Sequence, residues 1–298
     1  MVVCPTCGCT SVSFLDKQKR WQCAARHTKR QFSIKVGTIM EDSPIKLQKW
    51  LPVLWLIANC RNGISSWAIH RDLGVTQKTA WFMLHRVRLA MQDDLTGGML
   101  GGEVEVDETY IGGKVRNMHK DRKKKVQQHS QKGDKAIVLG ILERASAGKQ
   151  KKVRATVVAD RKKPTMQEEV RGNVEKGTQI HSDEFADKWR MDDEYEHNIV
   201  NHLQTYVQGN VHTNGIENFW SLLKRGLNGT YVAVEPFHLF RYVDEQAFRF
   251  NNRLTEDGDK LPDSERFSRL CSQIVGRRLT YKELIGKEGS SETDSMPF

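Results

Sequence analysis

The first 36 residues contain four of the six cysteines of this 298-residue chain, at positions 4, 7, 9 and 23. A segment this short cannot bury a core large enough to fold by itself, so it needs a metal or a disulfide. Cys4-x2-Cys7 and Cys23-x3-His27 offer three thiolates and an imidazole at the spacing of a closed tetrahedral zinc site. Cys9 could replace one ligand, and a set of free thiols is the alternative. We therefore predict a module held by one structural Zn²⁺ over residues 1–40.

The N-terminus, MVVCPTCGCT, lacks the basic and apolar regions of a signal peptide, and no run of eighteen apolar residues is present. We therefore expect a cytoplasmic protein without a membrane-spanning helix. In that compartment clustered cysteines indicate metal binding rather than disulfides.

The net charge of +10 favours a polyanionic partner such as nucleic acid, because each neutralised phosphate releases counterions. A basic protein without such a partner is the alternative. The charge is concentrated in residues 112–135, which hold nine Lys/Arg against two Asp. We expect an insertion loop there, either solvated or wrapped on a phosphate backbone, with Lys123, Lys124 and Lys125 as candidate DNA contacts.

Residues 41–96 have the pattern of a helix-turn-helix region. An apolar helix after Pro44 is interrupted at Asn62-Gly63. A short helix follows, which Ser65 or Ser66 can cap and which ends at Gly74.

A longer helix starts after Thr76. Its buried stripe should be Ala80, Leu84, Val87 and Met91, and the side chains expected to face outward are Gln77, Lys78, His85 and Arg88. Polar residues on a second helix of this kind can enter the major groove of DNA, so Gln77, Lys78 and Arg88 are candidate DNA contacts. An ordinary helical hairpin is the alternative.

After a glycine-rich hinge at residues 97–102 the pattern changes to alternating strands. Three strands over residues 103–113, 135–144 and 152–161 indicate an antiparallel meander. A helix over 164–176, two strands with a short helical piece between them, and a helix from His212 complete the order β-β-β-α-β-α-β-α. This is an α+β or α/β arrangement with a mixed sheet and flanking helices.

Three acids are placed where they could meet. Asp107 ends the first strand, Asp183 ends the fourth, and Glu217 lies on the helix that should pack back on the sheet. Converging carboxylates repel one another, and Mg²⁺, which prefers oxygen ligands, removes that penalty. Solvated acids are the alternative, because Glu103, Glu105, Glu108, Glu184 and Asp187 lie close by in the sequence.

Ile216, Phe219, Trp220 and Leu223 recur at helical spacing in the segment that carries Glu217, so that segment should pack as a helix. Two more helices are expected over residues 238–254 and 262–276. Residues 286–298 are polar and should be disordered.

These blocks carry a family resemblance. VEVDETYIGG, IHSDEFADKW and HTNGIENFWSLLKRGLNGTY resemble the three catalytic blocks of bacterial insertion-sequence transposases of the Asp-Asp-Glu type. CPTCG, WQC, RQFSIKVGTIMEDSPIKLQKW and HLFRYVDEQAFRFNNR resemble the subgroup with an N-terminal zinc ribbon. The likeness covers about residues 1–285, in order.

The resemblance implies a zinc ribbon (1–40), a helix-turn-helix region (41–96), a ribonuclease H-like catalytic domain (97–232), a helical extension (233–285) and a tail (286–298). It implies that Asp107, Asp183 and Glu217 hold two Mg²⁺ or Mn²⁺ ions. It also places Lys224 near the DNA, with Arg225 beside it.

The same resemblance implies an activity: water frees a 3′-OH at each end of the element, and that 3′-OH then attacks target DNA. Work on paired ends implies double-stranded DNA as partner and at least a dimer in the active complex. The location would be the bacterial cytoplasm, at the nucleoid when DNA is bound.

Two other functions remain open at this point. A non-catalytic DNA-binding regulator would keep the zinc ribbon and the helix-turn-helix but would not need the three acids. A ribonuclease H-like nuclease would cut without strand transfer. No G-x-S-x-G elbow and no P-loop are present, which argues against a serine hydrolase and an energy-coupled motor.

Overall fold

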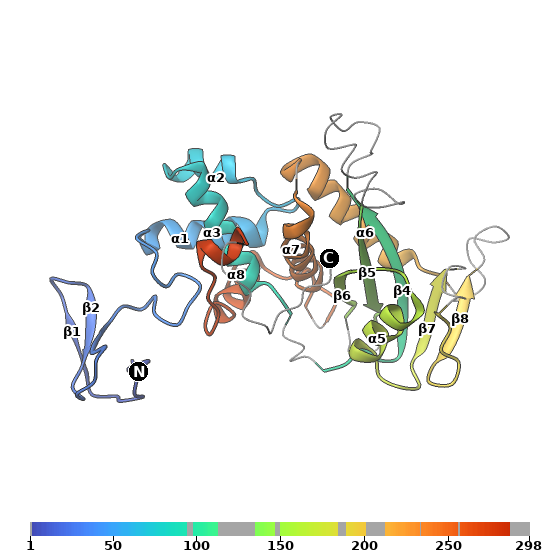
Figure 1. Cartoon of the computed structure of the whole chain (residues 1–298), viewed down its shortest axis with the longest axis horizontal. Helices are drawn as coiled ribbons and strands as arrows, with labels where there is room; N and C mark the ends of the chain where they lie inside the picture. Colours follow the sequence, from blue (N-terminus) through green and yellow to red (C-terminus); the bar gives the residue numbers. More distant parts are fainter. Residues whose placement is uncertain are drawn as a thin grey trace.

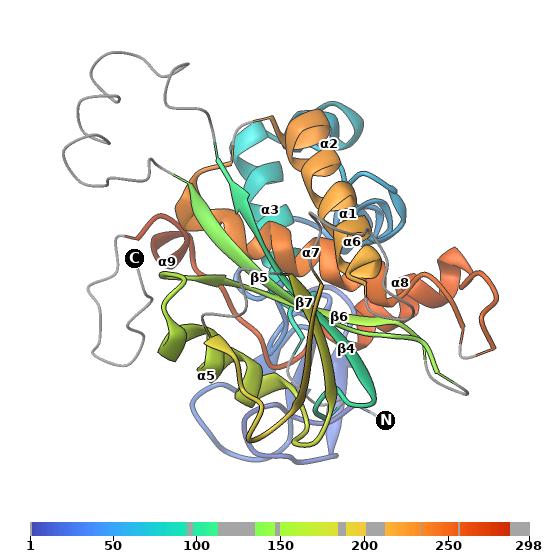
Figure 2. The same ribbon diagram turned by 90° about the vertical axis from the view of Figure 1, so that its right-hand side faces the viewer.

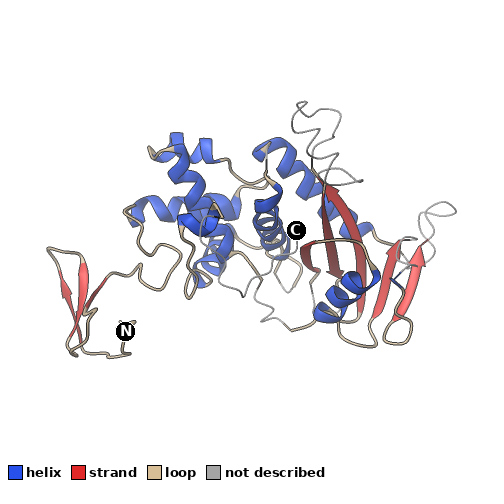
Figure 3. Ribbon diagram, in the orientation of Figure 1, coloured by secondary structure: helices blue, strands red, loops and turns tan. Residues whose placement is uncertain are grey.

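The computed structural model describes residues 2–93, 98–112, 135–146, 150–183, 189–200, 212–232, 234–255 and 257–286. Three groups of elements follow one another along the long axis of the molecule (Figure 1). A small β module lies at one end, helices lie in the middle, and a larger sheet with its own helices lies at the other end (Figure 3).

The N-terminal module is a three-stranded antiparallel sheet in the order β1-β2-β3, built from β1 (Val12–Leu15), β2 (Arg20–Cys23) and β3 (Gln31–Phe32). Its core consists of Cys4, Cys23 and Phe32, with a few half-buried side chains around them. So small a core is weak by itself, which agrees with the expected need for a metal.

The helices of residues 41–96 form where the sequence predicts them: α1 (Leu47–Asn59), α2 (Ser66–Leu73) and α3 (Gln77–Ala90). Ser65 caps α2 by accepting from the amide of Ala68, and Thr76 caps α3 by accepting from the amide of Thr79. Gly74 ends α2 in the left-handed conformation, at φ 57°, which glycine adopts without strain. The short turn between Gly74 and Thr76 fixes α3 against α2.

The buried stripe of α3 is confirmed, but the prediction that His85 and Arg88 face outward is wrong. Both side chains are buried, with 0% and 1% of their surface exposed. Nε of Arg88 lies 2.7 Å from Oε2 of Glu245, and His85 packs against the rings of Trp81 and His238. Because a guanidinium held in this way cannot reach a phosphate, Arg88 is not a DNA contact in this conformation.

The C-terminal helices return to the helical part of the molecule. They are α7 (Leu239–Asn251), α8 (Asp263–Ser272) and the single-turn α9 (Tyr281–Leu284). Phe248 of α7 and Leu270 of α8 lie in the same hydrophobic core as α1, α2 and α3. The core formed by α1, α2 and α3 is therefore completed by residues from the C-terminal part of the chain.

The larger sheet has five strands in the order β6-β5-β4-β7-β8. They are β4 (Glu103–Ile111), β5 (Ala136–Glu143), β6 (Lys152–Val158), β7 (Gln179–Asp183) and β8 (Glu196–Val200). The meander of β4, β5 and β6 is antiparallel as predicted, whereas β7 pairs parallel to β4 and β8 pairs parallel to β7. The predicted order of elements is found, apart from the short helical piece after β7, which lies mostly outside the described residues.

Helices cover both faces of this mixed sheet (Figure 2). On one face α5 (Lys163–Asn173) packs through Met166 and Val170. On the other face α6 (Asn214–Gly226) and α7 enclose a second core. Gly140 of β5 allows α6 to approach closely, since a Cβ there would lie 2.6 Å from the Trp220 ring. This architecture is compatible with a ribonuclease H-like domain.

None of the helices in the described ranges is both long enough and apolar enough to cross a membrane.

Candidate active site and metal-binding sites

Asp183 is the last residue of β7, and it lies beside Asp107, which is in the middle of β4 and not at its end as the sequence predicted. The parallel register of β4 and β7 pairs Val106 with Ser182, so the next residue on each strand is one of the two aspartates. Carboxylate oxygens of Asp107, Glu108 and Asp183 all lie within 4.8 Å of one another. Three acids from two adjacent strands thus form one cluster where β7 ends beside the middle of β4, hereafter the acid cluster.

Helix α6 supplies the support of this cluster. Its buried residues Ile216, Phe219 and Leu223 fix it on the sheet. Trp220 donates its indole N–H to Oδ2 of Asp107 at 2.9 Å, which orients that carboxylate.

Glu217 lies in the first turn of α6, with an exposed side chain. Its carboxylate is not in the group of oxygens within 4.8 Å, yet its charge still contributes to raising the pKa of Asp107. Thr213 does not cap α6 with its side chain; instead its hydroxyl donates to Oε1 of Glu217 at 3.0 Å. The structure therefore brings two of the three predicted acids together and places the third beside them.

Crowding and burial change the acidity of the cluster. Burial, reinforced by the charge of Asp183 and opposed by the Trp220 hydrogen bond, raises the pKa of Asp107 to about 6. Burial also raises the pKa of Glu108 to about 7, although Arg161 opposes that shift. Oxygen ligands this close together, with protonation favoured by mutual repulsion, fit a divalent cation such as Mg²⁺, which would relieve the repulsion.

Glu108 is the member of the cluster that the sequence does not single out. It forms an ion pair with Arg161, whose Nη1 also donates to the hydroxyl of Tyr110 at 2.7 Å. Neighbouring residues of a strand normally point to opposite faces, so alternation places Glu108 away from Asp107. The oxygens of the two residues are nevertheless close together, and both are close to Asp183, where β7 ends beside them.

The other candidate residues have varied surroundings. Lys224 and Arg225 are exposed on the last turns of α6, and neither belongs to an ion pair in the described part of the chain. Gln77 is half-buried and donates to Ser66 Oγ at 2.9 Å, whereas Lys78 is exposed with its Nζ 4.5 Å from the Tyr281 ring centre. Lys123, Lys124 and Lys125 lie outside the described residues.

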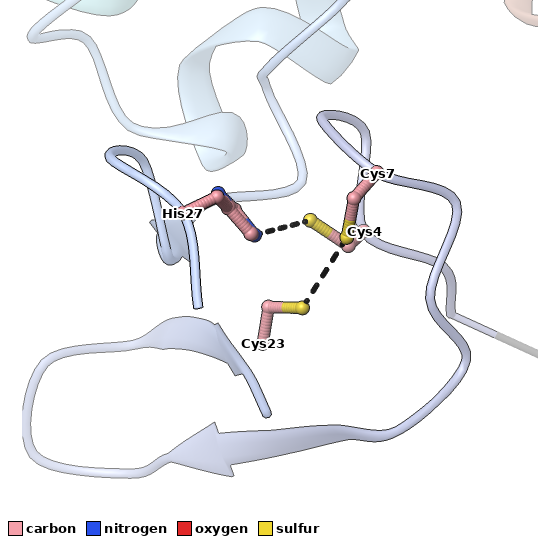
Figure 4. Close-up of side chains that lie close together, drawn as sticks. All are labelled: Cys4, Cys7, Cys23 and His27. Atoms are coloured by element: carbon pink, nitrogen blue, oxygen red, sulfur yellow. Dashed lines mark hydrogen bonds between the residues drawn. The ribbon is translucent and has the colours of Figure 1, made fainter. Parts of the chain in front are cut away.

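The four predicted zinc ligands converge in the N-terminal module (Figure 4). Sγ of Cys4 lies 3.5 Å from Nε2 of His27, and Sγ of Cys7 lies 3.6 Å from Sγ of Cys23. Around a tetrahedral Zn²⁺ with ordinary bond lengths, such separations should be about 3.6 Å for S to N and about 3.8 Å for S to S. The donor set and its spacing therefore fit zinc. Cys9 is outside this group, and its thiol points to the carbonyl of Ser11.

Comparison with known proteins agrees with this geometry. The profile of the ISXO2-like transposase domain matches residues 99–251, just over half of the chain. The chain is also similar to an uncharacterised protein in the transposable element ISH50 of Halobacterium salinarum, with 25% identity over 246 residues, covering 76% of this chain and 78% of the relative. The matched segment contains the whole five-stranded sheet, the acid cluster and the helix that carries Glu217. The chain therefore belongs to the ISXO2-like family of insertion-sequence transposases of the Asp-Asp-Glu type.

Proposed function

We propose that this transposase binds the terminal inverted repeats of its own element, hydrolyses a phosphodiester at each end, and joins the freed 3′-OH to target DNA by transesterification. The observation that carries the proposal is the convergence of Asp107, in the middle of β4, with Asp183, at the end of β7, beside Glu217 of α6. In a member of a transposase family, acids so arranged have no evident structural use and a clear catalytic one.

Asp107, Asp183 and Glu217 are the residues that would hold two Mg²⁺ or Mn²⁺ ions. Such ions, when bound, activate the attacking oxygen and stabilise the leaving oxygen of an in-line phosphoryl displacement. The chain itself fixes the acids. Trp220 orients Asp107, Thr213 donates to Glu217, and the apolar face of α6 holds the helix on the sheet.

DNA would be held by exposed basic and polar side chains. Lys224 and Arg225 stand on the same helix as Glu217, where a phosphate backbone approaching the acids would pass. Gln77 and Lys78 lie in the first turn of α3, the position from which a recognition helix touches bases. Because they are positively charged, Lys123, Lys124 and Lys125 are the remaining proposed DNA contacts. We also propose that the active complex is at least a dimer, because two element ends must be joined to one target.

The first test is an assay on the ends of the element. Purified protein with Mg²⁺ and its terminal-repeat DNA should produce nicks with a free 3′-OH, and then joined products when target DNA is added. Nicking without joining would indicate a nuclease of the same fold, and binding without nicking would indicate a DNA-binding regulator. Either result from wild-type protein, with both Mg²⁺ and Mn²⁺ tried, would overturn the proposal.

We further propose that Cys4, Cys7, Cys23 and His27 bind one structural Zn²⁺. Binding of this kind contributes about 10–16 kcal/mol in small zinc peptides, so the module should lose its fold without the metal. Native mass spectrometry is expected to show one zinc per chain in the wild type and close to none in Cys23→Ser.

Cys9→Ser provides the matched control for the zinc site, since it removes a thiol of the same module that lies outside the four-residue group. It should keep its zinc. Retention of zinc by Cys23→Ser together with its loss from Cys9→Ser would refute this set of ligands.

A further inference from the structure

Helix α6 begins without a capping side chain of its own. Thr213 occupies the N-cap position, but its hydroxyl is used by Glu217 and makes no cap hydrogen bond. The first N–H groups of any helix lack partners within the helix and need acceptors from elsewhere. At this helix the need matters, because the first turn carries Glu217.

Glu105 supplies the missing acceptor. The amide of Ile216 donates to Oε2 of Glu105 at 2.8 Å, and Glu105 is only 1% exposed. The negative charge of Glu105 also lies at the positive end of the α6 dipole, where it is favourable. The approach is close, since a Cβ on Gly215 would lie 2.8 Å from the same carboxylate oxygen.

Arg144, which directly follows β5, completes a clamp. Its Nε donates to Oε1 of Glu105 at 2.8 Å, and its Nη2 donates to the carbonyl oxygen of His212 at 2.5 Å. Its Nη1 lies 2.8 Å from Oε2 of Glu103. One guanidinium thus ties β4 to the residues that lead into α6.

The clamp joins the two elements that carry the proposed metal ligands. Glu105 precedes Asp107 by two residues on β4, and Ile216 directly precedes Glu217 on α6. Neither Glu105 nor Arg144 is part of the acid cluster. We infer that Glu105, held by Arg144, is a positioning residue that sets where Glu217 stands relative to Asp107 and Asp183. This inference rests on the proposed function of those three acids.

A buried ion pair that only supports the fold would also explain these contacts, so the test needs a matched control. Glu143 offers one: it is buried to 8% exposure on the neighbouring strand, and it accepts the amide of Gly101 at 3.2 Å. Glu143 is not one of the residues of the clamp described above. Glu105→Ala and Glu143→Ala therefore each remove a buried carboxylate that accepts a backbone amide, and only the first removes the clamp.

The full-length variants should be compared by three measurements. Glu105→Ala is expected to weaken Mn²⁺ binding in the absence of DNA, measured by calorimetry, by about 10- to 100-fold, and to slow end cleavage by a similar factor, as loss of an outer partner of a metal ligand does. Glu105→Gln should recover part of both, because its one amide oxygen can still accept from Ile216, although the amide NH2 group cannot accept from Arg144. Hydrogen exchange at the start of α6 should accelerate in Glu105→Ala and remain unchanged in Glu143→Ala.

Equal Mn²⁺ affinity and equal cleavage in Glu105→Ala and Glu143→Ala would overturn the positioning role, and so would unchanged exchange at Ile216. If Glu105→Ala does not fold, Glu105→Gln provides the test. Normal hydrogen exchange at the start of α6 in this variant, together with a 10- to 100-fold loss of Mn²⁺ affinity, would also overturn the positioning role. A wild type that neither binds Mn²⁺ nor cleaves DNA would instead refute the proposed function.

Discussion

Asp107→Asn is expected to lower the rate of end cleavage by about 10³-fold or more and, at the same time, to make the metal-free protein more stable. The loss of rate follows from removal of a charge that we propose holds a metal ion, and it corresponds to roughly 4 kcal/mol of transition-state stabilisation. The gain in stability follows because the folded protein disfavours the ionised form of the same carboxyl group, and asparagine cannot ionise. Burial and the charge of Asp183 raise its pKa from 3.8 to about 6.

The sign of the stability effect follows from proton binding. Because the folded state binds the Asp107 proton more tightly than the unfolded state, ionisation at higher pH opposes folding. The free-energy cost of ionising Asp107 in the folded state is absent below pH 3.8, grows as the pH rises toward about 6, and is constant above that pH. A shift of this size corresponds to at most about 3 kcal/mol, and we expect roughly 1–2 kcal/mol because the side chain is partly exposed.

Urea denaturation without divalent cations should therefore show Asp107→Asn to be more stable than wild type at pH 8 and equal to it near pH 4. Asp193→Asn is the control, since Asp193 is exposed and distant from the acid cluster. It should change neither cleavage nor stability. Wild-type cleavage by Asp107→Asn, with DNA binding intact in both proteins, would contradict the role of Asp107.

Local sequence signals predicted the helices of residues 41–96 well. Ser65, Gly74 and Thr76 each act within four residues of their own position, and the structure uses all three as caps or terminators. The strands could be predicted equally well from the sequence, because segments such as β5 are apolar on both faces and are buried on both. Helix caps and apolar strands depend on residues that are close together in the sequence, so they can be predicted from the sequence alone.

Features set by distant parts of the chain were harder to predict. Arg88 looks like a solvent-facing residue of an amphipathic helix until Glu245, 157 residues later, is brought against it. Glu108 looks like a solvated neighbour of Asp107 until β7 ends beside both. Likewise, no sequence feature near Glu105 predicts that it accepts a hydrogen bond from the amide of Ile216, which is 111 residues away.

The prediction of the candidate active site lies between these two cases. The sequence predicted that Asp107 and Asp183 meet because each would end a strand, but only Asp183 does so, and Asp107 lies in the middle of β4. Assignment of Glu217 needed the family resemblance, because Asn214, Asn218 and other polar residues share its helix. The position of Glu217 outside the closest group of acids is a property of the fold that no motif encodes.

Arg88, Glu245 and Arg249 form a buried charge network between α3 and α7. Oε2 of Glu245 accepts from Nε of Arg88 at 2.7 Å, and Oε1 accepts from Arg249 and from the hydroxyl of Tyr231. Tyr231 ends η3 (Leu227–Tyr231), the helical turn that continues α6. The network therefore connects the proposed DNA-reading helix with the helix that carries Glu217.

Burial opposes ionisation of Glu245, yet the guanidinium groups of Arg249 and Arg88 prevail and lower its pKa. The stabilisation is thus present above the ordinary glutamate value of 4.5 and is lost as the pH falls through the lower folded pKa. Near neutral pH the carboxylate is charged, and both guanidinium groups depend on it. Removing one member of such a network leaves a buried charge without compensation.

Glu245→Gln is therefore expected to lower the free energy of unfolding by about 3–5 kcal/mol at pH 7, measured as a shift of the urea midpoint at constant slope. The control is Glu265→Gln, which breaks the Arg269–Glu265 pair, whose side chains are 41% and 47% exposed, and it should cost about 0.5 kcal/mol or less. The deficit of Glu245→Gln should shrink at acid pH, where wild-type Glu245 also becomes protonated. A deficit as small as that of Glu265→Gln would mean that the contact between α3 and α7 depends on apolar packing around Phe248 and Tyr242 rather than on these charges.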